Sequence, residues 1–145
     1  MTPMEDIYKA FLSKMTEDDW TGWTEAEVQA DFNTLLDSAI VWFKFPKHSL
    51  EYNAEIGFSE TLTLREIQII STYMKCEWLN RTILTWENVK PLYDERDYSP
   101  ANFLNRLNNL LDREKKKAKE LESIYYRAID RKPFDYTQLA GDNYD

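Results

Sequence analysis

The sequence predicts a mainly α-helical protein: a helical bundle of about four helices with a long C-terminal helix, a short β-like arm and an extended C-terminal tail. Three observations predict this fold class. Of the 145 residues, 43% are hydrophobic and 14% aromatic, far more core-forming material than a disordered chain carries. Three Gly and five Pro are too few for the frequent turns of an all-β protein. Apolar residues also recur at steps of three and four after recognisable helix starts.

The length predicts one helical domain, placed at residues 1–132, followed by a tail at residues 133–145. The single cysteine excludes a disulfide framework and CxxC-type zinc sites. Charged residues interrupt the apolar positions near the N-terminus, and the longest apolar runs are far shorter than the roughly 18 residues of a membrane-spanning helix. We therefore expect no secretory signal, no membrane contact and synthesis in the cytoplasm.

Two helices are predicted in the first part of the chain. The first begins almost at the N-terminus, where Thr2 can act as the capping residue and Pro3 suits the first helical position. The second follows a capping box formed by Thr24 and Glu27 and runs to about Phe43. One face of this second helix is apolar, so another element must cover it.

Within residues 44–62 the apolar period changes from helical to two. The alternating apolar residues are Leu50, Tyr52, Ala54, Ile56 and Phe58. This pattern predicts a strand-like arm over about residues 50–58 that projects from the helical domain. Because a lone strand cannot satisfy its own backbone donors, we expect the arm to pair with another chain by strand addition. Simple solvation of the arm is the alternative.

A third helix is predicted from the capping box of Thr63 and Glu66 to about Leu84. It carries two apolar stripes and is therefore apolar on much of its circumference. This property makes it the best candidate for the central helix of the bundle.

The fourth helix is predicted to be the longest, because it starts at Ser99 and Pro100 and meets no breaker before Pro133. Its inner positions form a narrow, coiled-coil-like seam with one charged member. The seam consists of Leu104, Leu107, Leu111, Glu114, Ala118, Leu121, Tyr125 and Ala128. Since the core of a small domain is about as long as its shorter helices, we expect the distal part of this helix to project and to pack on something other than its own chain.

The residue types that build common catalytic and metal sites are scarce. His48 is the only histidine, which excludes a His-based metal site. A nucleophile–histidine pair would have to use His48, for which an ordinary surface position is the main interpretation. Cys76 lies among apolar residues of the third helix, where a buried, inert thiol is expected. The sequence has no Gly-rich phosphate loop. We predict no catalytic residue, no cofactor and no metal.

The charges are distributed unevenly. The net charge of −8 argues against a free-standing nucleic-acid-binding protein. Residues 1–60 hold 12 acidic and 4 basic side chains, whereas residues 61–145 hold 14 of each. The fourth helix carries a basic strip that consists of Lys115, Lys116, Lys117 and Lys119. Interleaved acidic residues favour a solvated or protein-facing strip, and we expect it to meet the acidic N-terminal region of a neighbouring subunit.

Two stretches of the chain resemble a known family. They are residues 60–83, ETLTLREIQIISTYMKCEWLNRTI, and residues 98–107, YSPANFLNRL, with the charged helix that follows. They are similar to head–tail connector, or adaptor, proteins of tailed bacteriophages that infect Gram-positive hosts, and the resemblance covers about residues 60–135. It implies a small helical protein without enzymatic activity, located in the neck of the virion and made in the host cytoplasm.

The resemblance also implies the partners. About a dozen copies would form a ring under the portal protein and extend the channel through which the genomic DNA passes without specific binding. The ring would offer a platform to the next neck component, a stopper or tail-completion protein. Residues 1–60 take no part in the resemblance, so it implies nothing about them.

The tail has neither a helical nor a strand period, and its apolar side chains are expected to contact the portal or an adjacent ring. These side chains are Phe134, Tyr136, Leu139 and Tyr144. The alternative is that the tail folds back along the fourth helix and covers its own domain.

Two further functions stay open beside the connector. One is a different minor neck, tail-completion or capsid-associated protein of the same virion. The other is a cytosolic helical protein that binds a protein of the host. An enzyme is the class with least support, because the sequence offers no set of nucleophile, base and orienting residue.

Overall fold

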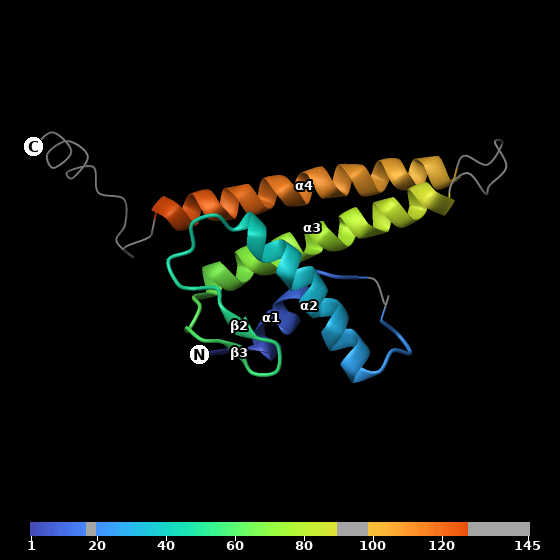
Figure 1. Cartoon of the computed structure of the whole chain (residues 1–145). Helices are drawn as coiled ribbons and strands as arrows, with labels where there is room; N and C mark the ends of the chain where they lie inside the picture. The colour runs from blue at the N-terminus through green and yellow to red at the C-terminus, as the bar shows by residue number, and fades with distance from the viewer. Residues whose placement is uncertain (17–19, 90–98, 128–145) are drawn as a thin grey trace, which may run out of the picture.

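The computed structural model describes residues 1–16, 20–89 and 99–127. It confirms the mainly helical class, with four helices and a small three-stranded sheet in these residues (Figure 1). The elements in chain order are β1 (Thr2–Pro3), α1 (Met4–Leu12), α2 (Glu25–Trp42), β2 (Tyr52–Asn53), β3 (Gly57–Phe58), α3 (Leu64–Val89) and α4 (Ser99–Arg127). The predicted tail contacts Phe134, Tyr136, Leu139 and Tyr144 lie outside the described residues.

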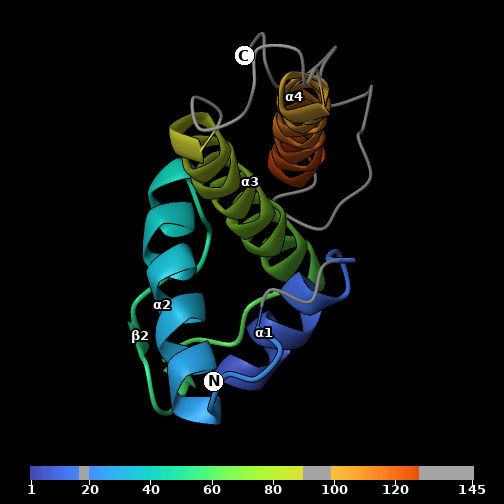
Figure 2. The ribbon, with the colours of Figure 1, turned by 90° about the vertical axis from the view of Figure 1, so that its right-hand side faces the viewer.

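The helix α3 is central, as predicted. The helix α4 lies antiparallel along one side of α3, while α1, α2 and the sheet lie on the other side (Figures 1 and 2). Side chains from α1, α2, α3 and β3 fill the core between them. The largest apolar side chains that are fully buried are Ile7, Phe11, Phe32, Leu36, Phe58, Ile69, Ile70, Met74 and Leu79. Their burial supplies the main driving force for folding.

Two of the three predicted capping residues are confirmed, and α4 begins at Ser99, as predicted. The hydroxyl of Thr24 accepts a hydrogen bond from the Glu27 backbone N–H at 3.2 Å, and Thr63 and Glu66 cap each other reciprocally. The prediction for Thr2 is wrong. Its hydroxyl accepts a hydrogen bond from the Leu62 N–H at 2.8 Å and donates to a carbonyl before α3, so it serves the chain leading into α3 instead of capping α1.

The prediction of a lone strand at residues 50–58 is also wrong. Tyr52 pairs with Phe58 on one edge of β3, and Thr2 pairs with Phe58 on the other. A turn closes the hairpin, because the Ile56 N–H donates to the Asn53 carbonyl at 3.1 Å. The N-terminus thus provides a partner strand from within the same chain, and β3 is paired on both of its edges.

The hairpin also separates the apolar arm residues that the alternation placed together. Phe58 is fully buried in the core, and the ring of Tyr52 lies against it with a centroid distance of 5.3 Å. Leu50 is half-buried, whereas Ile56 is 55% exposed at the turn. Phe58 is therefore unavailable to a partner, and Ile56 is the large apolar side chain of the arm that is exposed.

The helix α4 follows the predicted seam but not the predicted projection. Every seam position from Leu104 to Tyr125 is buried or half-buried against α3, and Ala128 lies outside the described residues. The expected projection fails because the distal turns of α4 lie against the start of α3 and the loop after α2, where Tyr125 contacts Glu66 and Lys47. At the other end, α3 continues to Val89, five residues beyond the predicted end at Leu84. Its 26 residues span about 39 Å and so cover most of the 29-residue α4. No helix within the described ranges is long and apolar enough to cross a membrane.

Candidate functional site

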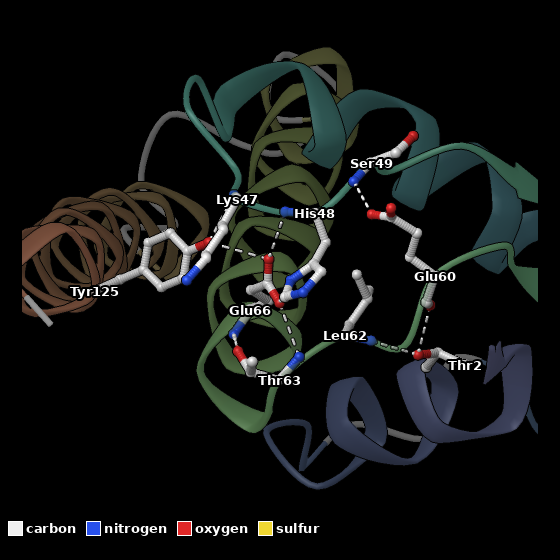
Figure 3. A network of polar contacts seen from close by, with 9 residues as sticks. All are labelled: Thr2, Lys47, His48, Ser49, Glu60, Leu62, Thr63, Glu66 and Tyr125. Carbon is white, nitrogen blue, oxygen red and sulfur yellow. Dashed lines mark hydrogen bonds and ion pairs between the residues drawn. The ribbon is translucent and has the colours of Figure 1, made fainter. Parts of the chain in front are cut away.

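A buried carboxylate, Glu66, lies where three separate segments meet (Figure 3). Its side chain is inaccessible to solvent. The Oε1 atom accepts a hydrogen bond from the Thr63 N–H at 2.8 Å and lies 2.8 Å from Nδ1 of His48. The Oε2 atom accepts from the hydroxyl of Tyr125 at 3.0 Å and from the His48 N–H at 3.4 Å. One carboxylate therefore joins the start of α3, the loop after α2 and the last turns of α4.

The same loop also holds the end of α4 through Tyr125. The Lys47 N–H donates a 2.7 Å hydrogen bond to the Tyr125 hydroxyl, which in turn donates to Glu66. The ring of Phe43 meets the ring of Tyr125 edge-on at 5.4 Å, and Phe45 meets the next tyrosine, Tyr126, at 6.2 Å. Polar and aromatic contacts thus hold the last described turns of α4 against the loop after α2.

The surroundings of Glu66 keep it ionised. Burial by itself raises the pKa of Glu66, but hydrogen bonds from Thr63, His48 and Tyr125 outweigh burial and hold the pKa below its ordinary value. Burial, together with the neighbouring Glu66 charge, raises the pKa of Tyr125 to about 12. At neutral pH the pair is therefore a carboxylate that accepts a hydrogen bond from a neutral phenol.

This network has the geometry of a structural junction. A carboxylate that holds Nδ1 of a histidine can orient the ring for base catalysis, but a nucleophile must then stand within hydrogen-bond reach. The hydrogen bonds of His48 in the described chain go to Glu66. The prediction of an ordinary surface histidine is wrong in one respect, since the His48 side chain is 28% exposed and paired with a buried group.

The single cysteine is the other residue with potentially reactive chemistry. Cys76 is buried, as predicted, and burial raises the pKa of its thiol to about 12. Within the residues described, no group of three or more His, Cys, Asp or Glu side chains is placed to hold a metal ion.

The outer face of α4 is strongly basic. Seven basic side chains of this helix are exposed, and only two acidic ones, Asp112 and Glu120, are exposed with them. The basic residues are Arg106, Arg113, Lys115, Lys116, Lys117, Lys119 and Arg127. All four residues of the predicted charge strip therefore lie on the solvent side of α4, and we call this set of seven the basic face.

The elements on the opposite side of α3 are strongly acidic. In the described part of residues 1–60, the exposed acidic residues are Glu5, Asp6, Glu25, Glu27, Asp37, Glu51, Glu55 and Glu60. The exposed basic residues of this part are Lys9, Lys44 and Lys47. We call these eight acidic residues the acidic face, and α3 separates the elements that carry it from α4 (Figure 2).

One charged pair lies inside the α3–α4 interface. Glu114, the charged member of the seam, is 7% exposed, and its Oε1 lies 3.2 Å from Nζ of Lys75. Its Oε2 is buried without a hydrogen-bond partner among the described residues. The pair interrupts an apolar seam at one position, which is the usual way in which a polar residue fixes the register of two helices.

The sequence reasoning found the basic strip but missed the junction at Glu66. Thr63 and Glu66 were visible as a capping box, and nothing local connected them with His48, 18 residues earlier, or Tyr125, 59 residues later. No family model, no curated protein and no solved structure matches this chain.

Proposed function

We propose that this chain is a non-enzymatic structural subunit of a phage virion, a head–tail connector that forms a ring under the portal. The observation that carries the proposal is the basic face of α4. This 29-residue helix packs on α3 along one side only, and its other side presents seven exposed cations. A surface of this kind gains from a protein partner of opposite charge.

The absence of suitable chemistry supports a structural role. His48 is engaged by Glu66, and the raised pKa of Cys76 keeps its thiol protonated. Among the described residues, no nucleophile is hydrogen-bonded to His48 and no general base is hydrogen-bonded to Cys76, so neither belongs to a complete catalytic set. We accordingly propose no cofactor and no substrate.

Exposed apolar side chains also favour an assembly role. Val41, Phe45 and Leu64 are each more than 70% exposed. Large apolar residues left on the surface of a small protein often contribute to contacts with partners. In the proposed connector, these contacts are with the portal, with the next neck component or with a neighbouring subunit.

The location of the protein in the particle tests the proposal. Cryo-EM of purified virions, with the chain carrying a C-terminal fusion tag as a density marker, should place it in a ring beneath the portal. Density at the tail tube or on the capsid would instead support another minor virion protein. Absence from thoroughly washed virions would support a host-directed cytosolic protein.

Co-purification provides a second test. Portal complexes released from disrupted virions should retain the chain in a fixed ratio to portal. Retention with tail tube or capsid, and not with portal, would contradict the connector assignment.

A further inference from the structure

We propose that the basic face of α4 binds the acidic face of a second copy of this chain, so that subunits associate head to tail. The inference rests on the proposed assembly function and adds to it the two surfaces that meet. The partner is identified by charge: a surface with a basic excess requires an acidic one, and this chain carries both.

The two faces cannot neutralise each other within one molecule. The elements that carry them lie on opposite sides of α3 (Figure 2). The basic face has seven exposed cations among two exposed anions, and the opposite part has eight exposed anions among three exposed cations. Each surface thus has an excess of five charges, of opposite sign, and the two are matched in number.

The opposite charges of the two faces also determine the symmetry of the contact between two copies of the chain. A two-fold symmetric dimer can pair basic with acidic residues only where both lie on the same patch. Because α4 and the elements that carry the acidic face lie on opposite sides of α3 (Figure 2), a two-fold contact centred on either face would oppose like charges and would repel. Contact between different faces avoids this repulsion. Such a heterologous contact leaves one basic and one acidic face free at the ends of every dimer, so that further copies add until a ring closes.

The hairpin end of the acidic face is the part best placed for contact. β1 pairs with β3, which brings Glu5, two residues after β1, to the same end of the molecule as the hairpin residues Glu51 and Glu55. The hairpin also presents the 55%-exposed Ile56. The basic face has its own apolar neighbour, Ile124, which is 46% exposed on α4. Each face therefore combines charge with an apolar side chain that can be desolvated on contact.

Charge reversal on each face separately tests the contact in the full-length chain. One variant carries Lys115→Glu, Lys116→Glu and Lys117→Glu, and the other carries Glu5→Lys, Glu51→Lys and Glu55→Lys. Sedimentation velocity should show that the unaltered protein self-associates at about 0.01 M ionic strength and dissociates at about 1 M, as the Debye length falls from about 30 Å to about 3 Å. Each variant should associate on the order of tenfold more weakly or remain monomeric.

Mixing the two variants is the decisive step. The first variant keeps the unaltered acidic face and the second keeps the unaltered basic face, so equal amounts should associate with each other through this one unaltered contact. Circular dichroism and melting curves that match the unaltered protein show that each variant is folded. The control is Glu87→Lys, an exposed reversal on α3 that belongs to neither face and should associate normally.

Two results would overturn the inference: an unaltered chain that stays monomeric at low ionic strength, or variants that do not associate with each other when mixed. Neither result bears on the location of the protein in the virion. A chain found in a neck ring but unable to associate through these faces would retain the proposed function and lose this interface.

Discussion

The hydroxyl of Tyr125, in the last turns of α4, donates a 3.0 Å hydrogen bond to the carboxylate of Glu66, in the first turn of α3. The two residues stand 59 positions apart in the sequence, and both are buried. The Tyr125 hydroxyl also accepts from the Lys47 N–H at 2.7 Å. This one phenol therefore links the two longest helices with the loop after α2.

Replacing Tyr125 by phenylalanine tests this link. The ring would remain, while the Lys47 N–H and Oε2 of Glu66 would each lose a partner. We expect the free energy of unfolding to fall by about 1 to 3 kcal/mol, because the variant loses a buried hydrogen bond to a charged carboxylate together with the bond from the Lys47 N–H. Urea denaturation measures the change. The control is Tyr8→Phe, which removes a hydroxyl bonded to Asn33 and should cost about 0.5 to 1.5 kcal/mol. Equal losses in both variants would contradict the linking role of Tyr125.

The lowered pKa of Glu66 predicts a pH-dependent stability. A carboxyl group whose pKa is lower in the folded state stabilises the protein at pH values above its ordinary pKa, which is 4.5 for Glu66. This contribution to stability disappears as the pH falls through the folded-state pKa. Glu66→Gln should therefore be less stable than the unaltered chain at pH 7, and the difference should shrink as the pH drops below 4.5. Urea denaturation across pH 3 to 7 measures it.

The exposed Glu87→Gln variant is the control for this pH series. It lies on α3, as Glu66 does, but its side chain is in solvent, so its stability should follow that of the unaltered protein. A difference between Glu66→Gln and the unaltered chain that does not change with pH would show that packing, and not charge, accounts for the loss.

A pair of glycines tests the close approach of β1 to β3. Gly57 has φ +135°, and a Cβ atom there would lie 2.1 Å from the backbone oxygen of Thr2. Gly22 has φ +85°, but a Cβ atom there would meet nothing within 4 Å. Gly57→Ala should combine backbone strain of about 1 to 3 kcal/mol with loss of the β1–β3 pairing, whereas Gly22→Ala should show the strain alone. Thermal unfolding compares them, and equal melting temperatures would contradict the pairing of β1 with β3.

The buried pair of Lys75 and Glu114 predicts a non-additive effect. Glu114→Leu alone leaves the ammonium of Lys75 in the helix interface and should cost about 3 to 5 kcal/mol. The double variant Lys75→Met with Glu114→Leu should recover most of this loss, because an apolar pair needs no desolvation of charge. Urea denaturation of the four proteins in the cycle measures the coupling. Additive losses would mean that the two side chains do not act as a pair.

Deletion of residues 133–145 tests the proposed role of the tail. If Phe134, Tyr136, Leu139 and Tyr144 contact the portal, the shortened chain should keep its melting temperature and fail to join portal complexes. If the tail instead packs on its own domain, the free energy of unfolding should fall by about 2 to 4 kcal/mol. A destabilised chain that still binds portal would contradict the portal contact.

Local chemistry in the sequence was sufficient to predict most of the helices. The capping residues Thr24 and Thr63 interact with positions three residues later, and the seam of α4 repeats every three or four residues. Such patterns involve neighbours on one helix turn, so they can be identified without knowing the rest of the fold. The exposure of the basic strip followed from the same periodicity, since Lys115, Lys116, Lys117 and Lys119 occupy positions between the seam residues.

Only the tertiary structure decided which distant segments of the chain contact each other. The alternation at residues 50–58 is compatible with a lone strand, and the pairing with β1 depends on Thr2, more than fifty residues away. Long-range packing likewise brings His48 and Tyr125 to Glu66 and places α4 and the elements that carry the acidic face on opposite sides of α3 (Figure 2). Contacts between distant segments form only when the whole core is buried, because loop closure has an entropic cost that no single contact offsets. The helices are thus determined by local interactions along the chain, whereas the sheet, the junction at Glu66 and the separation of charge are determined by the cooperative packing of the core.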